Sequence, residues 1–262
     1  MQRNSVQYTI IFAGLVCIFC SVLVATSAVV LADRQEANKR IYKQRNVLLA
    51  AGIIKDGQKV SNAEVATLFD ENIEVKLVDL KSGEYTDDPD PATYNQLAAR
   101  DNPSQSEVAP ANSSNIKRVP NKGTVFQVVK DSQVEAIVIP VEGYGLWGTL
   151  YGYLALEKDG RTIRGITYYD HKETPGLGGE VDNPKWKGLW PGRKAYDDEG
   201  KPAITVLKGV AGSVEEDPYH IDGMSGATIT SNGVTYMMDF WLGENGFGPF
   251  ISKFREQGGA PA

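Results

Sequence analysis

The residues with the clearest chemical potential lie in one short stretch, DGMSGATITSNG, which runs from Asp222 to Gly233. It is rich in small and hydroxyl-bearing side chains, and an apolar, aromatic-rich run, VTYMMDFWLG, follows it directly. A stretch of this kind at a helix start exposes backbone N–H groups, and the helix dipole adds partial positive charge there. Thr228, Thr230 and Ser231 can each donate a hydrogen bond to a phosphate. The same residues also suit a plain N-cap with neighbouring turn residues, and the pattern alone leaves both interpretations open.

A second nucleotide-like signal is Gly143-Tyr144-Gly145-Leu146-Trp147-Gly148, which is a literal G-x-G-x-x-G. In a dinucleotide-binding fold this turn must open a helix within a βαβ unit. Here TLYGYLALEKDG follows, which has the pattern of a strand running into a hairpin, so we reject that interpretation. The glycines still allow a ligand to approach the backbone, and Tyr144 or Trp147 offers it a flat aromatic face.

Other catalytic chemistry has weaker support. Gly223 to Ala227 nearly forms the nucleophile elbow of a hydrolase, with His171 and Glu173 as base and orienter, but Ala227 replaces the final glycine. Two histidines are too few for a convincing zinc site, so no metal is expected. The net charge of -6 argues against a nucleic-acid partner, because phosphate backbones require a basic face.

The elements that must position these residues begin with a membrane anchor, assigned to residues 1–33. Ile10 to Ala32 is largely apolar and uncharged, and a helix of that length spans roughly 35 Å, enough for a bilayer core. A cleaved signal peptide would have a shorter apolar region. Cys17 and Cys20 fall inside this span, where packing or lipid-facing roles are expected for them.

The rest of the chain predicts an α+β fold. Residues 34–122 are expected to form a juxtamembrane helix and strand block, with a Pro-, Asn- and Ser-rich excursion at 81–122. Residues 123–262 carry adjacent strand patterns, an Asp159-Gly160 hairpin turn, and a helix from about Ser231 to Leu242. This order predicts an antiparallel sheet flanked by helices.

Asp222 to Thr228, DGMSGAT, resembles the flavinylation motif of the FMN-binding domain family. The resemblance implies covalent FMN, with its phosphate esterified to Thr228 and with the positions around the acceptor shaped by Asp222, Ser225, Gly226 and Ala227. HKETPGLG, from His171 to Gly178, resembles the second signature of the family. An isoalloxazine ring requires flat apolar neighbours, for which the candidates are Tyr144, Trp147 and Leu177, while Glu173 and Thr174 are expected to contact polar ring edges or to brace the loop.

The whole chain resembles the C subunits of Na⁺-translocating NADH:quinone reductases. The resemblance implies a flavoprotein subunit that relays electrons in a complex coupling NADH oxidation and ubiquinone reduction to Na⁺ export. It is not expected to be catalytic alone, and its partners would be other subunits and a flavin transferase that draws FMN from FAD. The equivalent subunit of a ferredoxin:NAD⁺ electron-transport complex is the nearest alternative, and a non-redox anchored assembly module is another.

Two signals give opposite orientations for the anchor. Five basic residues between Arg34 and Arg45 follow the span, and the positive-inside rule places such a segment in the cytoplasm. The family resemblance instead implies a single-pass protein of the bacterial inner membrane with its soluble domain in the periplasm. We adopt the periplasmic expectation, because the charge rule loses force for a long translocated domain.

Overall fold

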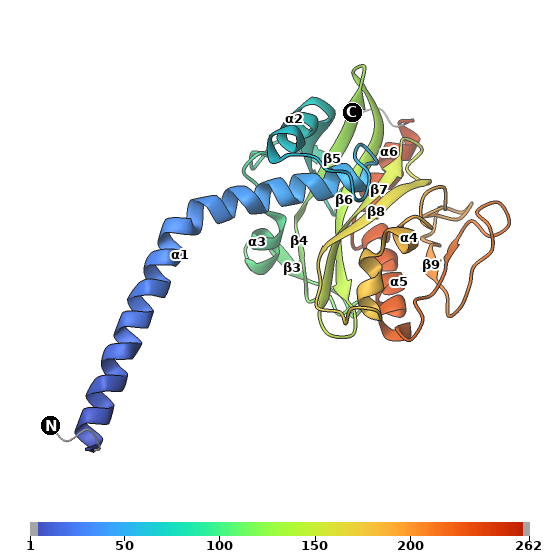
Figure 1. Cartoon of the computed structure of the whole chain (residues 1–262). Coiled ribbons are helices and arrows are strands. Elements are labelled where there is room, and N and C mark those ends of the chain that lie inside the picture. The colour runs from blue at the N-terminus through green and yellow to red at the C-terminus, as the bar shows by residue number, and fades with distance from the viewer. Residues whose placement is uncertain (1–4, 259–262) are drawn as a thin grey trace. The chain divides into compact units, whose positions relative to one another are not determined.

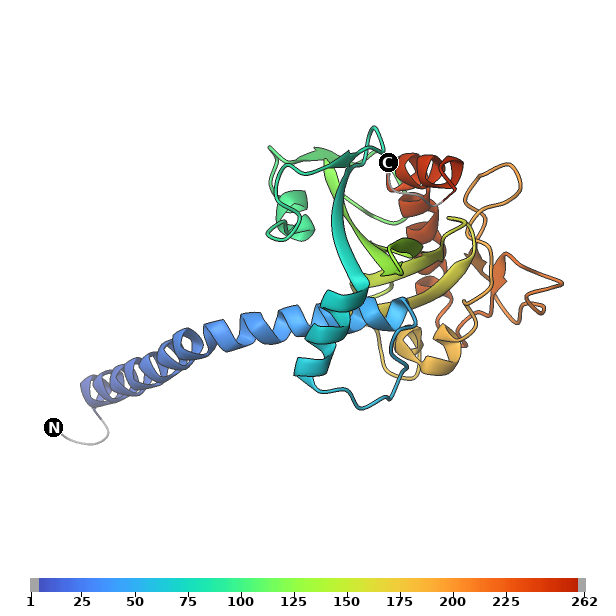
Figure 2. The same ribbon diagram turned by 90° about the horizontal axis from the view of Figure 1, so that it is seen from above.

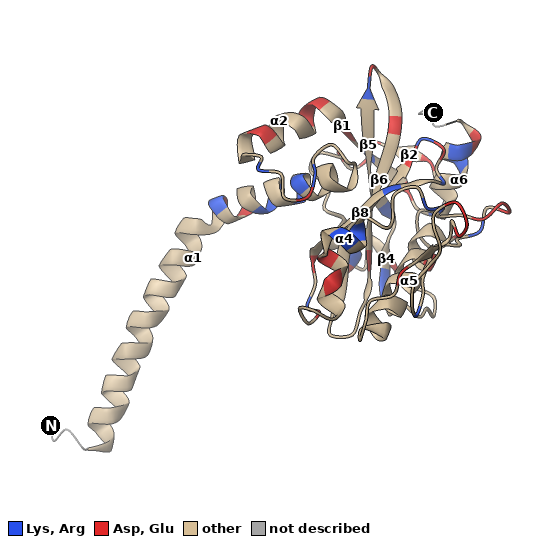
Figure 3. Cartoon of the chain, turned by 45° about the vertical axis from the view of Figure 1, so that its right-hand side comes forward, with Lys and Arg blue, Asp and Glu red and all other residues tan. Residues whose placement is uncertain are grey.

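The computed structural model describes residues 5–258. The chain divides into two compact units, one up to Tyr42 and one from Lys43 onward. Helix α1 (Val6–Ala50) begins in the first unit, and its uncharged part is the uniformly tan stretch of ribbon in Figure 3. It is long and apolar enough to cross a membrane, and its most apolar window is not buried in the structure. The predicted long apolar N-terminal helix is confirmed, and it fits a single membrane anchor.

The second unit is built on a six-stranded antiparallel sheet with the strand order β2-β1-β5-β6-β7-β8 (Figure 1). This sheet confirms the predicted α+β class. Its strands are β1 (Ile73–Asp79), β2 (Tyr85–Thr86), β5 (Lys122–Lys130), β6 (Gln133–Tyr144), β7 (Thr149–Glu157) and β8 (Ile163–Asp170).

The remaining elements are short, apart from one helix. They are α2 (Asn62–Asn72), α3 (Gln96–Asp101), β3 (Ser106–Val108), β4 (Arg118–Pro120), η1 (Gly178–Asp182), α4 (Pro184–Lys187), β9 (Thr205–Val206), β10 (His220–Ile221), α5 (Thr228–Leu242) and α6 (Gly248–Glu256).

The polar segment 81–122 packs on the sheet. The Tyr94 hydroxyl donates to the carbonyl of Lys122 at 2.7 Å, and the Gln96 side chain accepts from the Thr124 amide at 2.7 Å. Strand β1 also pairs with β5 along its whole length, across the expected division at residue 122. The divisions at residues 33 and 122 remain predictions, whereas the structure joins residues 43–122 to the sheet domain.

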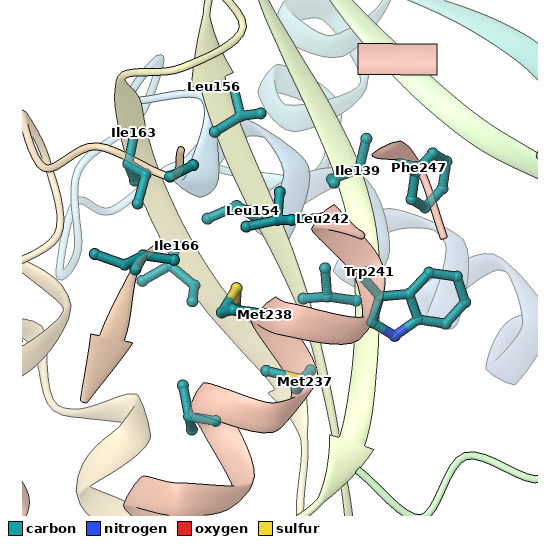
Figure 4. Close-up of a cluster of buried hydrophobic side chains, with 14 of the residues drawn as sticks. Ile139, Leu154, Leu156, Ile163, Ile166, Met237, Met238, Trp241, Leu242 and Phe247 are labelled. Atoms are coloured by element: carbon teal, nitrogen blue, oxygen red, sulfur yellow. The ribbon is translucent and has the colours of Figure 1, made fainter. Parts of the chain in front are cut away.

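One face of the sheet is covered by α5, which buries its apolar side against β6 and β7 (Figure 4). Alternate residues of each strand point to this layer, as the period of two in a strand requires. Ile139 of β6 and Leu154 of β7 lie there against Met238 and Trp241 of α5, all of them buried. The Trp241 indole N–H also donates to the carbonyl of Glu142 at 2.7 Å. The C-terminal half of α5 is therefore held at a fixed place on the sheet.

The opposite face is covered by α2 and by the last turns of α1, so the second unit has three layers (Figures 1 and 2). Phe69 of α2 packs edge-on against Phe126 of β5, with ring centroids 6.1 Å apart. In α1, Asn46 is buried and accepts from the Thr167 hydroxyl of β8 at 3.1 Å. Gly165 of β8 has no side chain, because a Cβ there would collide with the carbonyl oxygen of Ala50.

Two local predictions about turns and helix starts have different outcomes. The Asp159-Gly160 turn joins β7 to β8, and Gly160 has a φ of 60°, as a tight hairpin with glycine allows. Helix α5, however, begins at Thr228 rather than near Ser231. The expected start was wrong because Thr230 and Ser231, which are good N-cap residue types, lie inside the first turn and bond elsewhere.

Candidate functional site

The site is centred on the start of α5. Met224 to Ala227 form a turn, closed by the Ala227 amide donating to the Met224 carbonyl at 3.1 Å. Gly226 has a φ of 72°, which few other residues adopt without strain. Ala227 is the N-cap residue and offers no side-chain hydrogen bond. Thr228 follows as the first helical residue, and its side chain is exposed.

The first backbone amides of α5 are open. Within residues 5–258, the amide N–H groups of Thr228, Ile229 and Thr230 have no acceptor. Three other helices of the domain satisfy such groups with a side-chain cap, from Ser61 in α2, Asn95 in α3 and Asn183 in α4, whereas α6 lacks one as α5 does. Open N–H groups together with the helix dipole form a site for an anion. The start of α5 is therefore a candidate anion site.

The hydroxyl groups of the motif divide into two sets. Those of Thr228 and Ser225 lie at the surface. Thr230 is 0% exposed and donates to Glu173 Oε2 at 2.5 Å, while Ser231 is 2% exposed and accepts from the Met224 amide at 3.2 Å. The expectation that Thr230 and Ser231 hold a phosphate with their hydroxyls does not fit this geometry. Because the helix begins three residues earlier than expected, both side chains turn inward.

The G-x-G-x-x-G segment is the turn between β6 and β7, so no dinucleotide-binding helix follows it. The Gly145 amide donates to the Gly148 carbonyl at 2.8 Å and closes the turn. Leu146 and Trp147 stand at its tip, 41% and 63% exposed. The turn lies against α5, because a Cβ on Gly233 would collide with the carbonyl oxygen of Tyr144.

Glu173 links this turn to the helix. Its carboxylate is buried and accepts from the amides of Leu146 and Trp147 and from the Thr230 hydroxyl. Of its two expected roles, bracing the loop fits this geometry. His171, proposed as a base with Glu173, instead accepts from the Glu173 amide through Nδ1 at 3.3 Å and lies 3.6 Å from Asp182. No base and orienter pair of the hydrolase type is formed by these two residues.

The loop after Glu173 brings an apolar side chain to the same place. Thr174 is exposed, and its carbonyl accepts from the amides of Leu177 and Gly179 at 3.1 and 2.9 Å, which folds the loop back. Leu177 is 44% exposed and lies over Gly226, where a Cβ would come within 2.9 Å of Leu177 Cδ2. The loop thus places an aliphatic side chain beside the uncapped helix start.

Asp222 anchors the approach to the motif. Its Oδ1 accepts from the Ala211 amide at 2.8 Å, and its carbonyl accepts from the Trp186 indole N–H at 2.8 Å. Gly223 lies so close to Leu207 that a side chain there would collide with the Leu207 carbonyl. Asp222 therefore fixes the loop that leads to Thr228. Trp186 was not anticipated in this role, because its contact with Asp222 joins residues 36 positions apart.

Two apolar residues at the site were also not anticipated. Leu146 and Ile229 are both exposed, Leu146 beside Trp147 and Ile229 beside Thr228. A usable signal exists for Ile229, because it follows Thr228 directly within Ser225 to Gly233, where every other residue is small or polar. Within the described residues, no cluster of three or more His, Cys, Asp or Glu is placed to hold a metal ion.

Comparison with known proteins bears on this arrangement. Residues 145–243 match the model of the FMN-binding domain family. The C subunit of the Na⁺-translocating NADH-quinone reductase from Yersinia pestis is 44% identical, over 97% of this chain and 95% of that protein. The corresponding protein from Pseudomonas aeruginosa is also 44% identical, over 97% of this chain and 98% of that one. This chain belongs to that family of C subunits.

Solved structures agree with the assignment. The crystal structure of NqrC from Shewanella oneidensis has a TM-score of 0.76 and 38% identity, covering 84% of this chain and 99% of that one. The crystal structure of the C subunit from Parabacteroides distasonis has a TM-score of 0.66 and 27% identity, covering 85% and 97%. The family resemblance drawn from the two motifs is confirmed. The matched FMN-binding segment contains the β6–β7 tip, the loop after Glu173 and the start of α5.

Proposed function

We propose that this chain is the flavin-carrying subunit of a Na⁺-translocating NADH-quinone reductase, with FMN held as a phosphoester on Thr228. The observation that carries the proposal is the start of α5, which has three open amides, no side-chain cap and an exposed threonine as its first residue. Relatives that match nearly the whole chain are named as subunits of this reductase, which supports membership of such a complex. The match to the FMN-binding domain family supports FMN as the cofactor.

The residues present fit FMN. The amides of Thr228, Ile229 and Thr230 would donate hydrogen bonds to phosphate oxygens, and Thr228 Oγ1 would form the ester bond to phosphorus. Leu146, Trp147 and Leu177 would pack against the ring. Flavin supplies one- and two-electron chemistry when bound, whereas the protein holds it and exposes an edge. Ser225, Gly226 and Ala227 are small and leave room for the phosphate.

The chain contributes a relay rather than a complete reaction. Its one nucleotide-like glycine motif is a hairpin turn, so nothing in residues 5–258 supports a separate NADH site. One anchor helix cannot by itself enclose an ion path. The neighbouring subunits would therefore supply the NADH, quinone and Na⁺ sites. The ferredoxin-linked alternative is not favoured, because the relatives at 44% identity bear the quinone reductase name, and an uncapped, accessible acceptor gives no support to a non-redox module.

The proposal includes the maturation and placement of the domain. A flavin transferase would have to reach the acceptor, and the exposure of Thr228 suits this access better than the buried Thr230 or Ser231. We place the domain on the periplasmic side of a bacterial inner membrane, as the family resemblance implies. Cysteine labelling from outside intact cells, at an introduced Ser104→Cys in the sheet domain, tests that side; exclusive labelling after lysis contradicts it.

Intact mass and in-gel flavin fluorescence test the attachment. The full chain is made with a flavin transferase, denatured and separated, and the wild type should fluoresce and gain the mass of one FMN less one water. Thr228→Ala should be dark at the unmodified mass, whereas Thr67→Ala, the same change on the exposed Thr67 of α2, should fluoresce fully. A fluorescent Thr228→Ala, or a dark wild type, contradicts the proposal.

A further inference from the structure

We propose that Glu173 is a positioning residue that holds the apolar side chains of the flavin site in register with the attachment point. Its carboxylate joins three separate segments, namely the β6–β7 turn, its own loop and the first turn of α5. The proposal rests on FMN attachment at Thr228. In this proposal Glu173 fixes the distance between Trp147 and Thr228 and does not itself contact the cofactor.

The hydrogen bonds to Glu173 use both of its oxygens. Oε1 accepts from the amides of Leu146 at 3.0 Å and Trp147 at 2.9 Å, and Oε2 accepts from the Thr230 hydroxyl at 2.5 Å and from the Leu146 amide at 3.2 Å. Hydrogen bonds to an ionised acceptor are about twice as strong as neutral ones. The two consecutive amides fix the tip of the turn, and the hydroxyl fixes that tip to α5.

Two glycines leave the space that the carboxylate occupies. A Cβ on Gly145 would lie 2.7 Å from Glu173 Oε1, and a Cβ on Gly178 would lie 2.5 Å from both Glu173 Oε2 and Thr230 Oγ1. Both glycines have ordinary negative φ angles, so close approach rather than backbone strain excludes a side chain there. The β6–β7 turn and the loop from His171 to Gly178, which are far apart in sequence, thus enclose the carboxylate of Glu173.

A direct contact between Glu173 and a ring edge does not fit. The residue is 5% exposed, and both oxygens already have protein donors. Leu146 and Trp147, by contrast, direct exposed side chains outward from the very amides that Glu173 binds. Without the carboxylate these two amides lose their acceptor, and the tip of the turn loses its hydrogen-bonded link to α5, which leaves only the packing of Tyr144 against Gly233. The ring platform would then move independently of Thr228.

Hydrogen exchange on the flavin-free full chain in detergent tests the first part. Glu173→Ala should raise exchange in peptide 143–149 by roughly tenfold or more, because two amides lose charge-assisted hydrogen bonds. Glu173→Gln should stay within about threefold of the wild type, since its carbonyl can accept from the turn and its amide can donate to Thr230. Unchanged exchange in Glu173→Ala overturns the proposal. So does an equal rise throughout β6 and β7, which would make Glu173 a residue of general stability.

Flavin fluorescence in the flavinylated chain tests the second part. Thr230→Val removes only the bond between Oε2 and α5, so flavin fluorescence should rise as the ring leaves the Trp147 indole, while exchange at 143–149 stays near wild type. The matched control is Thr235→Val, which removes from α5 a hydroxyl that accepts from the Val206 amide at 2.9 Å, and it should change neither measurement. Equal fluorescence in Thr230→Val and the control overturns the positioning role.

The two proposals fail separately. If the wild type carries no covalent flavin, the attachment to Thr228 fails, whereas the exchange experiment on flavin-free protein still decides whether Glu173 holds the turn. If flavin is attached and both exchange and fluorescence ignore Glu173 and Thr230, only the positioning role fails.

Discussion

Replacing Gly233 by alanine should destabilise the domain, although the same change in most helices stabilises. Gly233 lies in the middle of α5, where alanine is normally favoured over glycine by about 1 kcal/mol. Here the helix backbone touches the β6–β7 turn. An added Cβ would lie well inside 3.0 Å of the Tyr144 carbonyl oxygen, with Gly145 Cα at 3.2 Å and the Tyr144 carbonyl carbon at 3.3 Å.

The magnitude follows from the competition between these two effects. Overpacking a tight contact costs about 1–3 kcal/mol, and the upper half of that range applies because the collision is with backbone, which cannot rotate away. After subtracting the gain in helix propensity of about 1 kcal/mol, a net loss of about 1–2 kcal/mol remains. For a domain of this size that corresponds to a fall in Tm of roughly 2–8 °C.

Thermal unfolding of the flavin-free full chain in detergent, followed by circular dichroism, measures this loss. The control is Asn232→Ala, at the exposed neighbouring position of the same helix, where only propensity changes and Tm should rise slightly, by about 1–2 °C. A Gly233→Ala variant as stable as the wild type, or stabilised like the control, would refute the close packing of α5 on the turn. The same result would remove the steric reason for a glycine at this position.

Three further predictions concern other parts of the domain. Burial raises the pKa of Glu142 despite Arg100 beside it, so its folded form holds a proton more tightly than its unfolded form. The stability of the wild type relative to Glu142→Gln should therefore be greatest below pH 4.5 and fall as pH rises through the raised pKa, which urea unfolding at about pH 4 and about pH 7 measures; a difference independent of pH contradicts it. Ser61→Ala should cost about 1 kcal/mol in urea unfolding, because it removes the capping box with Glu64, and a change below about 0.3 kcal/mol would show that the cap is not used. Trp147→Leu should alter stability by less than about 0.5 kcal/mol, since the side chain is exposed, yet lengthen the flavin fluorescence lifetime; an unchanged lifetime would separate Trp147 from the ring.

The parts of the fold that could be predicted are those coded by local patterns. The apolar span at Ile10 to Ala32 needs only composition, and the Asp159-Gly160 turn needs only two residues. Each is formed by residues within a few positions of one another. Neighbouring strands with hairpin turns then indicate an antiparallel sheet without any knowledge of long-range contacts.

The start of α5 could not be predicted for a physical reason. Rules for helix starts assume that a protein satisfies its own first amides with a Ser, Thr, Asp or Asn side chain, which directed the expected start toward Thr230 and Ser231. The helix begins at Thr228 with alanine as N-cap and leaves its amides open. Under the proposed function, these amides are left for a phosphate, so the helix departs from the rule at the functional position. The links made by Glu173 were equally hidden, because they join residues 26 to 57 positions apart.

The exposure of the site bears on why a covalent bond is useful there. Pockets for dissociable ligands usually bury most of the ligand surface, about 70–90% of it. Leu146, Trp147 and Leu177 are instead 41–63% exposed. Under the proposed function, such a shallow platform would hold a free flavin weakly, whereas an ester on Thr228 keeps it in place without burial. The open side of the ring then remains available to a neighbouring redox centre. A deeper pocket would bind flavin more tightly but would increase the distance to that partner, so attachment at a helix end reconciles retention with access.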